Sequence, residues 1–186
     1  MDFGTAAACE GRAGGHDVAG GVGEDQGGGG RAVAGAEEAG RVIRIIARGT
    51  PAPQGSKSFK GMSNAGRAIL AESSKKVRPW RQDVKAAAEH LRACTGAPPI
   101  DGPVVCRMTF TLPKPTSAPK RRRTYPMRTP DLSKLVRSTE DALTDAGIWT
   151  DDARVIGYTK LRKTYPMEDV DALDTPGVVI EIMEVV

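Results

Sequence analysis

The chain has 186 residues, with 27 basic and 23 acidic side chains and a formal net charge of +4. This length suits one domain with a sizeable core plus a terminal extension, and it is too short for two full domains. The three cysteines are an odd number without a close pair, which argues against a disulfide framework or a zinc ribbon and fits a reducing cytoplasm. The sequence shows neither a signal-peptide pattern at its start nor an apolar run of membrane-spanning length, so we expect a soluble cytoplasmic protein without a membrane partner.

Composition changes sharply near residue 40. Residues 1–40 are dominated by Gly and Ala, with four consecutive glycines at 27–30, and such a segment buries too little apolar surface to offset its ordering entropy. It holds seven acidic and two basic residues, so residues 41–186 carry a formal charge of +9. We therefore expect a disordered acidic tail over 1–40 and one basic folded domain over 41–186, suited to a polyanionic partner.

The first elements of the folded part are a strand and a helix. Residues 41–48 are rich in β-branched side chains and predict a strand. The loop expected over 51–58 superficially resembles a phosphate-binding loop, but its glycine spacing is wrong and two prolines remove backbone donors. Residues 79–94 begin with proline and repeat apolar residues along one stripe, which predicts a core-packing helix.

The later elements alternate strands with a second helix. We expect a strand over 103–112, an irregular basic loop over 113–130, a helix over 132–146 stopped by Gly147, and strands over 153–163 and 177–185. This order predicts an α+β fold, a mixed β-sheet with two main helices packed on one face.

Acidic and basic side chains gather around the second helix. Carboxylates stand at its two ends, and the loop before it holds a run of four basic residues and Tyr125. Carboxylates can hold a divalent cation while Lys and Arg hold a DNA backbone, so the combination indicates metal-dependent chemistry on a phosphodiester. The Tyr125 ring offers a surface on which an unpaired base can stack.

Three short segments carry a resemblance to a known family. They are Pro130-Asp131-Leu132-Ser133-Lys134-Leu135, Asp141-Ala142-Leu143-Thr144 and Trp149-Thr150-Asp151-Asp152-Ala153-Arg154-Val155. Together they resemble the RusA family of Holliday junction resolvases, and weaker matches at 51–57 and 72–80 are similar to its phage-borne branch. The resemblance covers residue 41 to the end. It implies a RusA-like fold and a homodimeric, magnesium-dependent endodeoxyribonuclease that resolves branched DNA by paired symmetric nicks, in recombination and repair.

The resemblance also implies roles for individual residues. Asp131 and Asp152 match catalytic, metal-holding aspartates, with Asp151 adjacent, and Mg²⁺, or Mn²⁺ in its place, is the implied cofactor. Ser133 stands at the second acidic position of the family's Asp-x-Asp motif, where a hydroxyl can ligate the metal but brings no charge. Arg137 stands where the family often has a catalytic lysine, so the positive charge is kept but is carried by a planar guanidinium instead of a compact ammonium.

The expected DNA-binding surface is drawn from the basic residues around this site. Its members are Lys57, Lys75, Lys76, Lys120, Arg121, Arg122, Arg123, Tyr125 and Lys134. A rival interpretation is a non-catalytic DNA-junction-binding protein that has lost metal chemistry through Ser133. Simpler structural roles also exist, because an aspartate at position 131 suits a helix N-cap, and Asp141 and Asp145 are expected on a solvated helix face.

Helix geometry raises a question about how the site closes. A helix over 132–146 is about 22 Å long, so Asp131 and Asp152 start from opposite ends. The five residues 147–151 reach at most about 17 Å when extended, so they are too short to bring the chain back along the whole helix to Asp131. Either the helix starts later, with 131–133 in a folded-back loop, or the two carboxylates meet across the twofold axis of a dimer.

Overall fold

A computed structural model describes residues 41–55, 57–62, 66, 68–72, 75–119 and 121–185, without the side chains of 57–60 and 68–72. The tail expected over 1–40 lies outside these residues. The strands are β1 (Val42–Arg48), β2 (Lys57–Met62), β3 (Ala68–Glu72), β4 (Val104–Thr111), β5 (Val155–Thr164) and β6 (Gly177–Glu184). The helices are α1 (Val77–Thr95), α2 (Leu132–Asp145) and the short 3-10 helix η1 (Asp152–Arg154).

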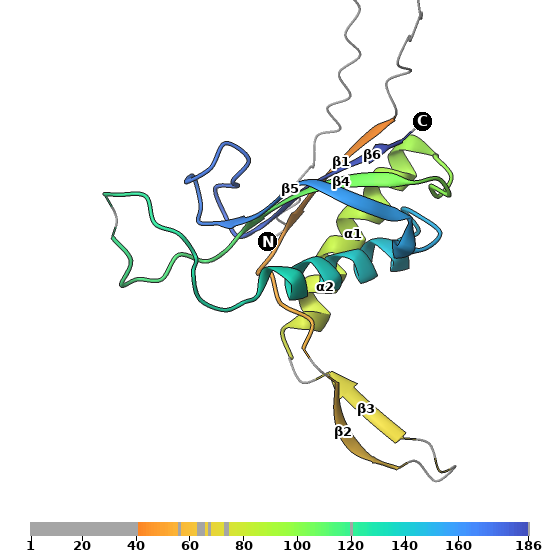
Figure 1. Ribbon diagram of the computed structural model, residues 1–186, viewed down its shortest axis with the longest axis horizontal. Coiled ribbons are helices and arrows are strands. Elements are labelled where there is room, and N and C mark those ends of the chain that lie inside the picture. The colour runs from red at the N-terminus through yellow and green to blue at the C-terminus, as the bar shows by residue number, and fades with distance from the viewer. Residues whose placement is uncertain are drawn as a thin grey trace, which may run out of the picture. The chain divides into compact units, whose positions relative to one another are not determined.

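The main sheet has four strands in the order β1-β6-β4-β5. β6 pairs antiparallel with both β1 and β4, whereas β4 and β5 run parallel. A parallel pair needs a crossover connection, and α2 lies within it. Both long helices cover the same face of the sheet (Figure 1), so the predicted α+β fold with a mixed sheet and two helices on one face is confirmed.

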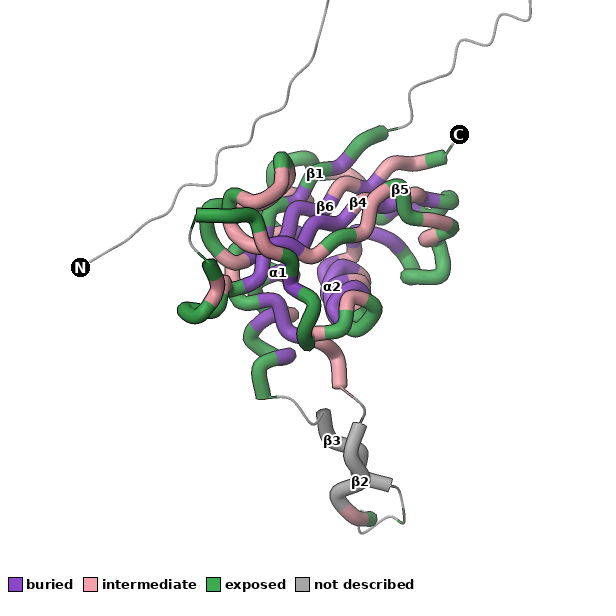
Figure 2. Tube along the Cα trace, turned by 60° about the vertical axis from the view of Figure 1, so that its left-hand side comes forward, coloured by how far each residue is buried: buried purple, intermediate pink, exposed green. Residues whose placement is uncertain are grey.

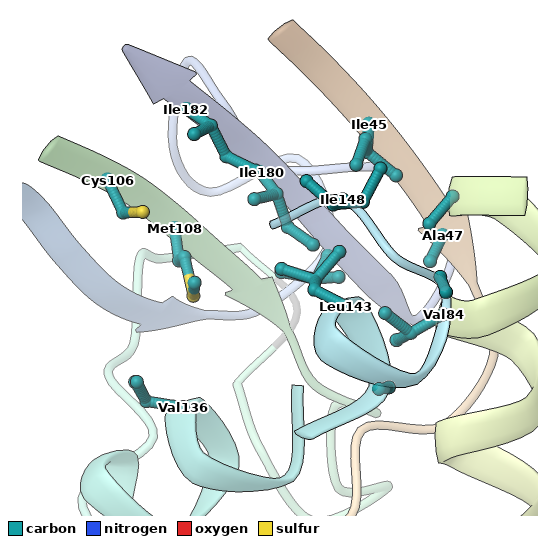
Figure 3. Close-up of a cluster of buried hydrophobic side chains, with 14 of the residues drawn as sticks. Ile45, Ala47, Val84, Cys106, Met108, Val136, Leu143, Ile148, Ile180 and Ile182 are labelled. Carbon is teal, nitrogen blue, oxygen red and sulfur yellow. The ribbon is translucent and has the colours of Figure 1, made fainter. Parts of the chain in front are cut away.

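The core lies between the helices and that face of the sheet. Alternate residues of β1 are buried, and their register places them opposite alternate residues of β6. Figure 2 shows the buried positions concentrated in this layer, and Figure 3 shows Ile45, Ile180 and Met108 of the sheet near Val84 of α1 and Leu143 of α2. This packed layer fixes α2 on the sheet and thereby positions the residues at its two ends.

The helix α1 begins at Val77, two residues before its predicted start, so that Pro79 lies in its first turn. Trp80, Val84 and Ala88 are buried along the predicted stripe. The helix ends at Gly96, whose left-handed φ of 63° suits a residue without a Cβ.

The sequence missed the hairpin formed by β2 and β3. These strands pair antiparallel in a separate two-stranded sheet, with a register shift between Phe59 and Gly61, and the predicted loop over 51–58 is therefore wrong from residue 57. Each strand has six residues or fewer, and the glycine interrupts the alternation on which a strand prediction depends. Among the described helices, none is long and apolar enough to cross a membrane.

Candidate active site and nucleic-acid interface

Asp131 occupies the N-cap position of α2, but its carboxylate makes no capping hydrogen bond. It lies instead 3.0 Å from the Lys134 ammonium, with 53% of the side chain exposed. The approach to the helix is anchored by Lys163 of β5, which donates hydrogen bonds to the carbonyl oxygens of Arg128 (2.8 Å) and Pro130 (2.9 Å). The backbone at Asp131 is thus held in place while its carboxylate stays accessible to a ligand.

The first half of α2 presents its polar residues to solvent. Ser133 and Arg137 are exposed, whereas Leu135 and Val136 are buried. Positions four and seven residues apart lie on one helix face, so Ser133, Arg137 and Glu140 share a face. Arg137 makes no ion pair within the part of the chain that the structure describes, so its guanidinium is available to an anion.

Asp151 and Asp152 follow α2 on a turn that is tied to the segment before β4. Ile100 forms a bridge with Trp149, and Asp101 accepts hydrogen bonds from Thr150 (2.9 Å) and Arg154 (2.6 Å). The Asp151 carboxylate accepts a 2.8 Å bond from the Ala153 backbone N–H and so caps η1. The Asp152 side chain is exposed and has no such local role.

The two predicted metal-holding aspartates flank α2 in the chain, one before its start and the other after its end. Because α2 begins at Leu132, the alternative of a later helix start with a folded-back loop is wrong. The helix has 14 residues and spans about 21 Å, with Asp131 at its start and Asp152 beyond its end. Within the described ranges, no group of three or more His, Cys, Asp or Glu side chains could hold a metal ion, so Asp131, Asp151 and Asp152 do not form such a group in one protomer.

A hydrogen bond between α2 and β5 was missed by the sequence analysis. Tyr158 donates from its hydroxyl to Glu140. Burial raises the pKa of Glu140, and the negative charges of Asp152 and Asp141 raise it further, although the Tyr158 bond opposes them. Burial and Glu140 in turn raise the pKa of Tyr158. Because the charge of Asp152 raises this pKa, Glu140 lies within electrostatic reach of Asp152. In the sequence, only the helical spacing between Ser133 and Glu140 indicated that Glu140 shares the face of the candidate site.

The expectation of a solvated helix face holds for Asp145, which is exposed, whereas Asp141 is half-buried. The Arg81 guanidinium of α1 lies 3.4 Å from the Asp141 carboxylate and 2.6 Å from that of Asp145. These pairs tie the two helices together. Beside them is a hollow of about 580 Å³ lined by Lys75, Val77, Arg78, Arg81, Gln82, Lys85 and Asp145.

The predicted DNA-binding residues fall on separate parts of the molecule. Lys75 and Lys76 are exposed at the start of α1, and Lys134 is exposed on α2. Lys57 lies in β2, where side chains are not described, and Lys120 is outside the described residues. Arg121, Arg122, Arg123 and Tyr125 are exposed on the loop before α2.

Part of the basic loop is neutralised from within the chain. Lys114 lies 2.6 Å from Glu168, and Arg123 lies 3.7 Å from Asp169. Arg121 and Arg122 make no ion pair among the described residues. The loop therefore has an anchored part and two cations free to meet an external anion.

The acidic anchor Asp169 is itself surrounded by cations. Its carboxylate, only 4% exposed, lies 3.0 Å from Lys160 and 2.5 Å from Arg162. Burial alone would raise the pKa of Asp169, but hydrogen bonds outweigh it, with Lys160 the largest contributor, and hold that pKa well below its usual range. Asp169 therefore stays ionised at neutral pH, and through it the segment 165–176 between β5 and β6 holds Arg123 of the basic loop.

A mixed sheet covered by two helices, with exposed aspartates on both sides of α2 next to a basic loop, suits the class of proteins that act on nucleic acid. The sequence profile of the family described as endodeoxyribonuclease RusA matches residues 49–183, well over half of the chain. The chain belongs to this family and is an endodeoxyribonuclease, whose substrate is DNA and whose family resolves Holliday junctions. No curated protein matches the chain.

Proposed function

We propose that this chain is a magnesium-dependent nuclease that resolves four-way DNA junctions by paired symmetric nicks, with Mn²⁺ able to replace Mg²⁺. Family membership supplies junction resolution and dependence on a divalent metal in general. The observation that carries the proposal is the pair of exposed aspartates, Asp131 and Asp152, at the two ends of α2 beside a basic loop. Such side chains have no evident role in holding the fold.

Each candidate residue has a role that its position supports. A bound divalent cation would activate water and neutralise charge on the phosphate. Asp131 and Asp152 would hold it, Ser133 would offer a hydroxyl, and Asp151, already engaged in capping η1, would act from its other oxygen or as an outer partner. Arg137 would stabilise the negative charge that develops on the phosphate in the transition state.

The active form in this proposal is a homodimer. Two symmetric nicks need two equivalent sites, which a twofold axis provides. The separation of Asp131 and Asp152 by the length of α2 supports a composite site, in which one protomer contributes Asp131 and its partner contributes Asp152. Two copies of α2 running antiparallel across the axis would bring opposite ends of the helix together.

The rival function is a junction-binding protein without catalysis. It would rest on Ser133, which removes one negative charge from the family's motif. Exposed carboxylates repel phosphate, however, and a protein that only binds DNA would gain affinity by losing them. The retention of three exposed aspartates, Asp131, Asp151 and Asp152, favours the enzyme. We place its action on DNA in the cytoplasm of a bacterial or phage-infected cell, since an odd number of cysteines with no close pair in the sequence suits a reducing compartment.

The deciding experiment is a nicking assay on a synthetic four-way junction and on a linear duplex of the same sequence, with Mg²⁺, with Mn²⁺ and with a chelator. The proposal expects paired cuts at symmetric positions of the junction, only with metal, and little cleavage of the duplex. Binding to the junction without cleavage under every metal condition would establish the rival function.

A further inference from the structure

The basic loop and Tyr165, directly after β5, line an open hollow of about 350 Å³ that includes Tyr125, the ring on which the sequence predicts that a base can stack. It is lined by Ala118, Arg122, Arg123, Thr124, Tyr125, Met127 and Tyr165. This volume is at the lower end of the roughly 300–1,000 Å³ range of small-ligand sites. Two aromatic rings, a thioether and two guanidinium groups form a lining that suits a flat, aromatic, anionic ligand such as a nucleotide base with its phosphate.

The large side chains at this hollow are unusually exposed for their type. Tyr125 is 62% exposed and Met127 is 89% exposed. Single exposed apolar residues are ordinary, but neighbours that line one hollow together indicate a binding surface. The Arg123 guanidinium lies 5.1 Å from the centre of the Tyr125 ring, within the range of a cation–π contact. This contact favours one orientation of the ring.

The walls of the hollow are held in place before any ligand arrives. Glu168 accepts a 2.6 Å bond from Lys114 and a 3.1 Å bond from the Thr124 backbone N–H. Burial alone would raise the pKa of Glu168, but the hydrogen bonds from Lys114 and Thr124 lower it, so the anchor is charged at neutral pH. A site that is already ordered loses less conformational entropy on binding, which favours recognition of a specific group over loose backbone contact.

The hollow lies close along the chain to the candidate active site. Met127 lies four positions before Asp131, a reach of at most about 14 Å. A base held beside Met127 therefore belongs to a nucleotide near the phosphate that Asp131 would meet. A four-way junction supplies such a base, because pairs at its branch point unstack more readily than those inside a linear duplex.

We propose that this hollow binds one unstacked nucleobase at the branch point of the junction, stacked on Tyr125 and walled by Tyr165 and Met127. The identity of the substrate as a junction rests on the proposed function, whereas the capture of a base does not require cleavage. The site would make binding selective for branched DNA and would position the strand next to the scissile phosphate.

The test compares Tyr125→Ala with Tyr125→Phe in the full chain, using metal-free binding to a four-way junction and to a linear duplex of matched length. Removing a base-stacking ring costs roughly 5- to 150-fold in affinity. Tyr125→Ala should show such a loss on the junction but less than twofold on the duplex, and Tyr125→Phe should bind both like the wild type. Val170→Ala, at a 93% exposed position outside the hollow, serves as the control and should change neither.

A second readout places the base directly. A junction carrying 5-iodouracil at the branch point should crosslink on irradiation to Tyr125 or Tyr165 in the wild type.

Equal losses on junction and duplex, no loss with Tyr125→Ala, or crosslinks only outside the hollow would overturn the proposal. If the wild type never nicks junctions yet Tyr125→Ala loses junction binding selectively, the nuclease proposal fails and the base site stands. If the wild type nicks junctions but Tyr125→Ala binds them normally, the base-site proposal fails and the nuclease proposal stands.

Discussion

Ser133 is the residue at which this chain departs most clearly from the pattern of its family. Its exposed hydroxyl lies two residues after Asp131, in the first turn of α2. We expect Ser133→Asp to lower the Mg²⁺ concentration for half-maximal nicking by about tenfold, because added ligand charge raises affinity for a hard cation. The measurement is a magnesium titration of junction nicking.

A matched control for that variant is Ser117→Asp, which adds the same charge at an exposed position of the basic loop. It should leave the magnesium requirement unchanged, whatever it does to DNA binding. An unchanged or higher requirement in Ser133→Asp would indicate that residue 133 lies outside the coordination sphere.

Asp169 offers a test of the acidic anchor through stability. Its folded-state pKa is lowered, so its contribution to stability is present above the unfolded value near ~4 and is lost as pH falls through the folded value. Asp169→Asn leaves Lys160 and Arg162 without their shared carboxylate. We expect a loss of roughly 1–3 kcal/mol in the free energy of unfolding at pH 7.

The measurement for Asp169→Asn is chemical denaturation of wild type and variant from pH 7 down to pH 3. The difference between them should shrink as the pH drops below ~4, because Asp169 of the unfolded wild type then takes up a proton while the folded carboxylate stays ionised. A difference that is the same at pH 3 and pH 7 would mean that the charge of Asp169 is not what stabilises the segment 165–176.

The sequence located some site residues and could not locate others. The helix bounds and the motif spacing placed Asp131 and Asp152 at the two ends of α2, as the structure has them. The Glu140–Tyr158 bond depends on the register of β5 against β4, which two irregularities shift. A register of this kind follows from tertiary packing rather than from local periodicity, so the sequence did not predict that Tyr158 is the partner of Glu140.

At the scale of elements, the basic loop is the part whose role is most easily measured. Replacing Arg121, Arg122 and Arg123 with Ala should weaken binding to every DNA tested. It should also flatten the salt dependence, with the slope of log K against log salt falling by roughly 0.9 for each lost phosphate contact. Since Arg123 is paired with Asp169, we expect a fall of about 1.8 rather than 2.7. Binding isotherms at several salt concentrations give the slope.

The matched control removes two exposed cations, one directly before the edge strand β1 and one within it. Arg41 and Arg44 lie 3.7 Å and 3.5 Å from Glu184 and Glu181, and Arg41→Ala with Arg44→Ala should leave the slope nearly unchanged. The same slope in the loop variant and the wild type would show that the loop is not on the DNA.

The elements themselves were predictable to the extent that their apolar periodicity was strong. Both long helices and the four strands of the main sheet follow from it, with ends displaced by one or two residues. The β2–β3 hairpin carries no such signal, because its strands are short and glycine breaks their alternation. The strand expected from residue 153 begins instead at Val155, because Asp151 caps a turn of 3-10 helix first.

At the scale of the whole molecule, we propose that residues 41–186 carry the complete activity. The core residues of the described part all lie between Ile43 and Ile182, and residues 1–40 contain almost no large apolar side chain. Deleting 1–40 should leave the melting temperature within about 2 °C and junction nicking within about twofold, since surface changes away from core features are worth under ~0.5 kcal/mol. A truncated protein that fails to fold would contradict the domain boundary.

The central claim about the proposed dimer is that each active centre takes Asp131 from one protomer and Asp152 from its partner. The claim follows from the length of α2, whose 14 residues span about 21 Å, with Asp131 before its start and Asp152 after its end. In an isologous dimer the same contact occurs twice. Two equal centres, one for each strand to be cut, would result.

The most direct test mixes inactive Asp131→Asn protein with inactive Asp152→Asn protein, lets subunits exchange, and isolates the heterodimer by two different affinity tags. In a shared site, one centre of the heterodimer receives both substitutions while the other receives neither, so one working centre returns and single nicks appear in the junction. If each centre were built within one chain, both centres of the heterodimer would stay defective. Persistent inactivity of a verified, junction-binding heterodimer would therefore contradict the composite site.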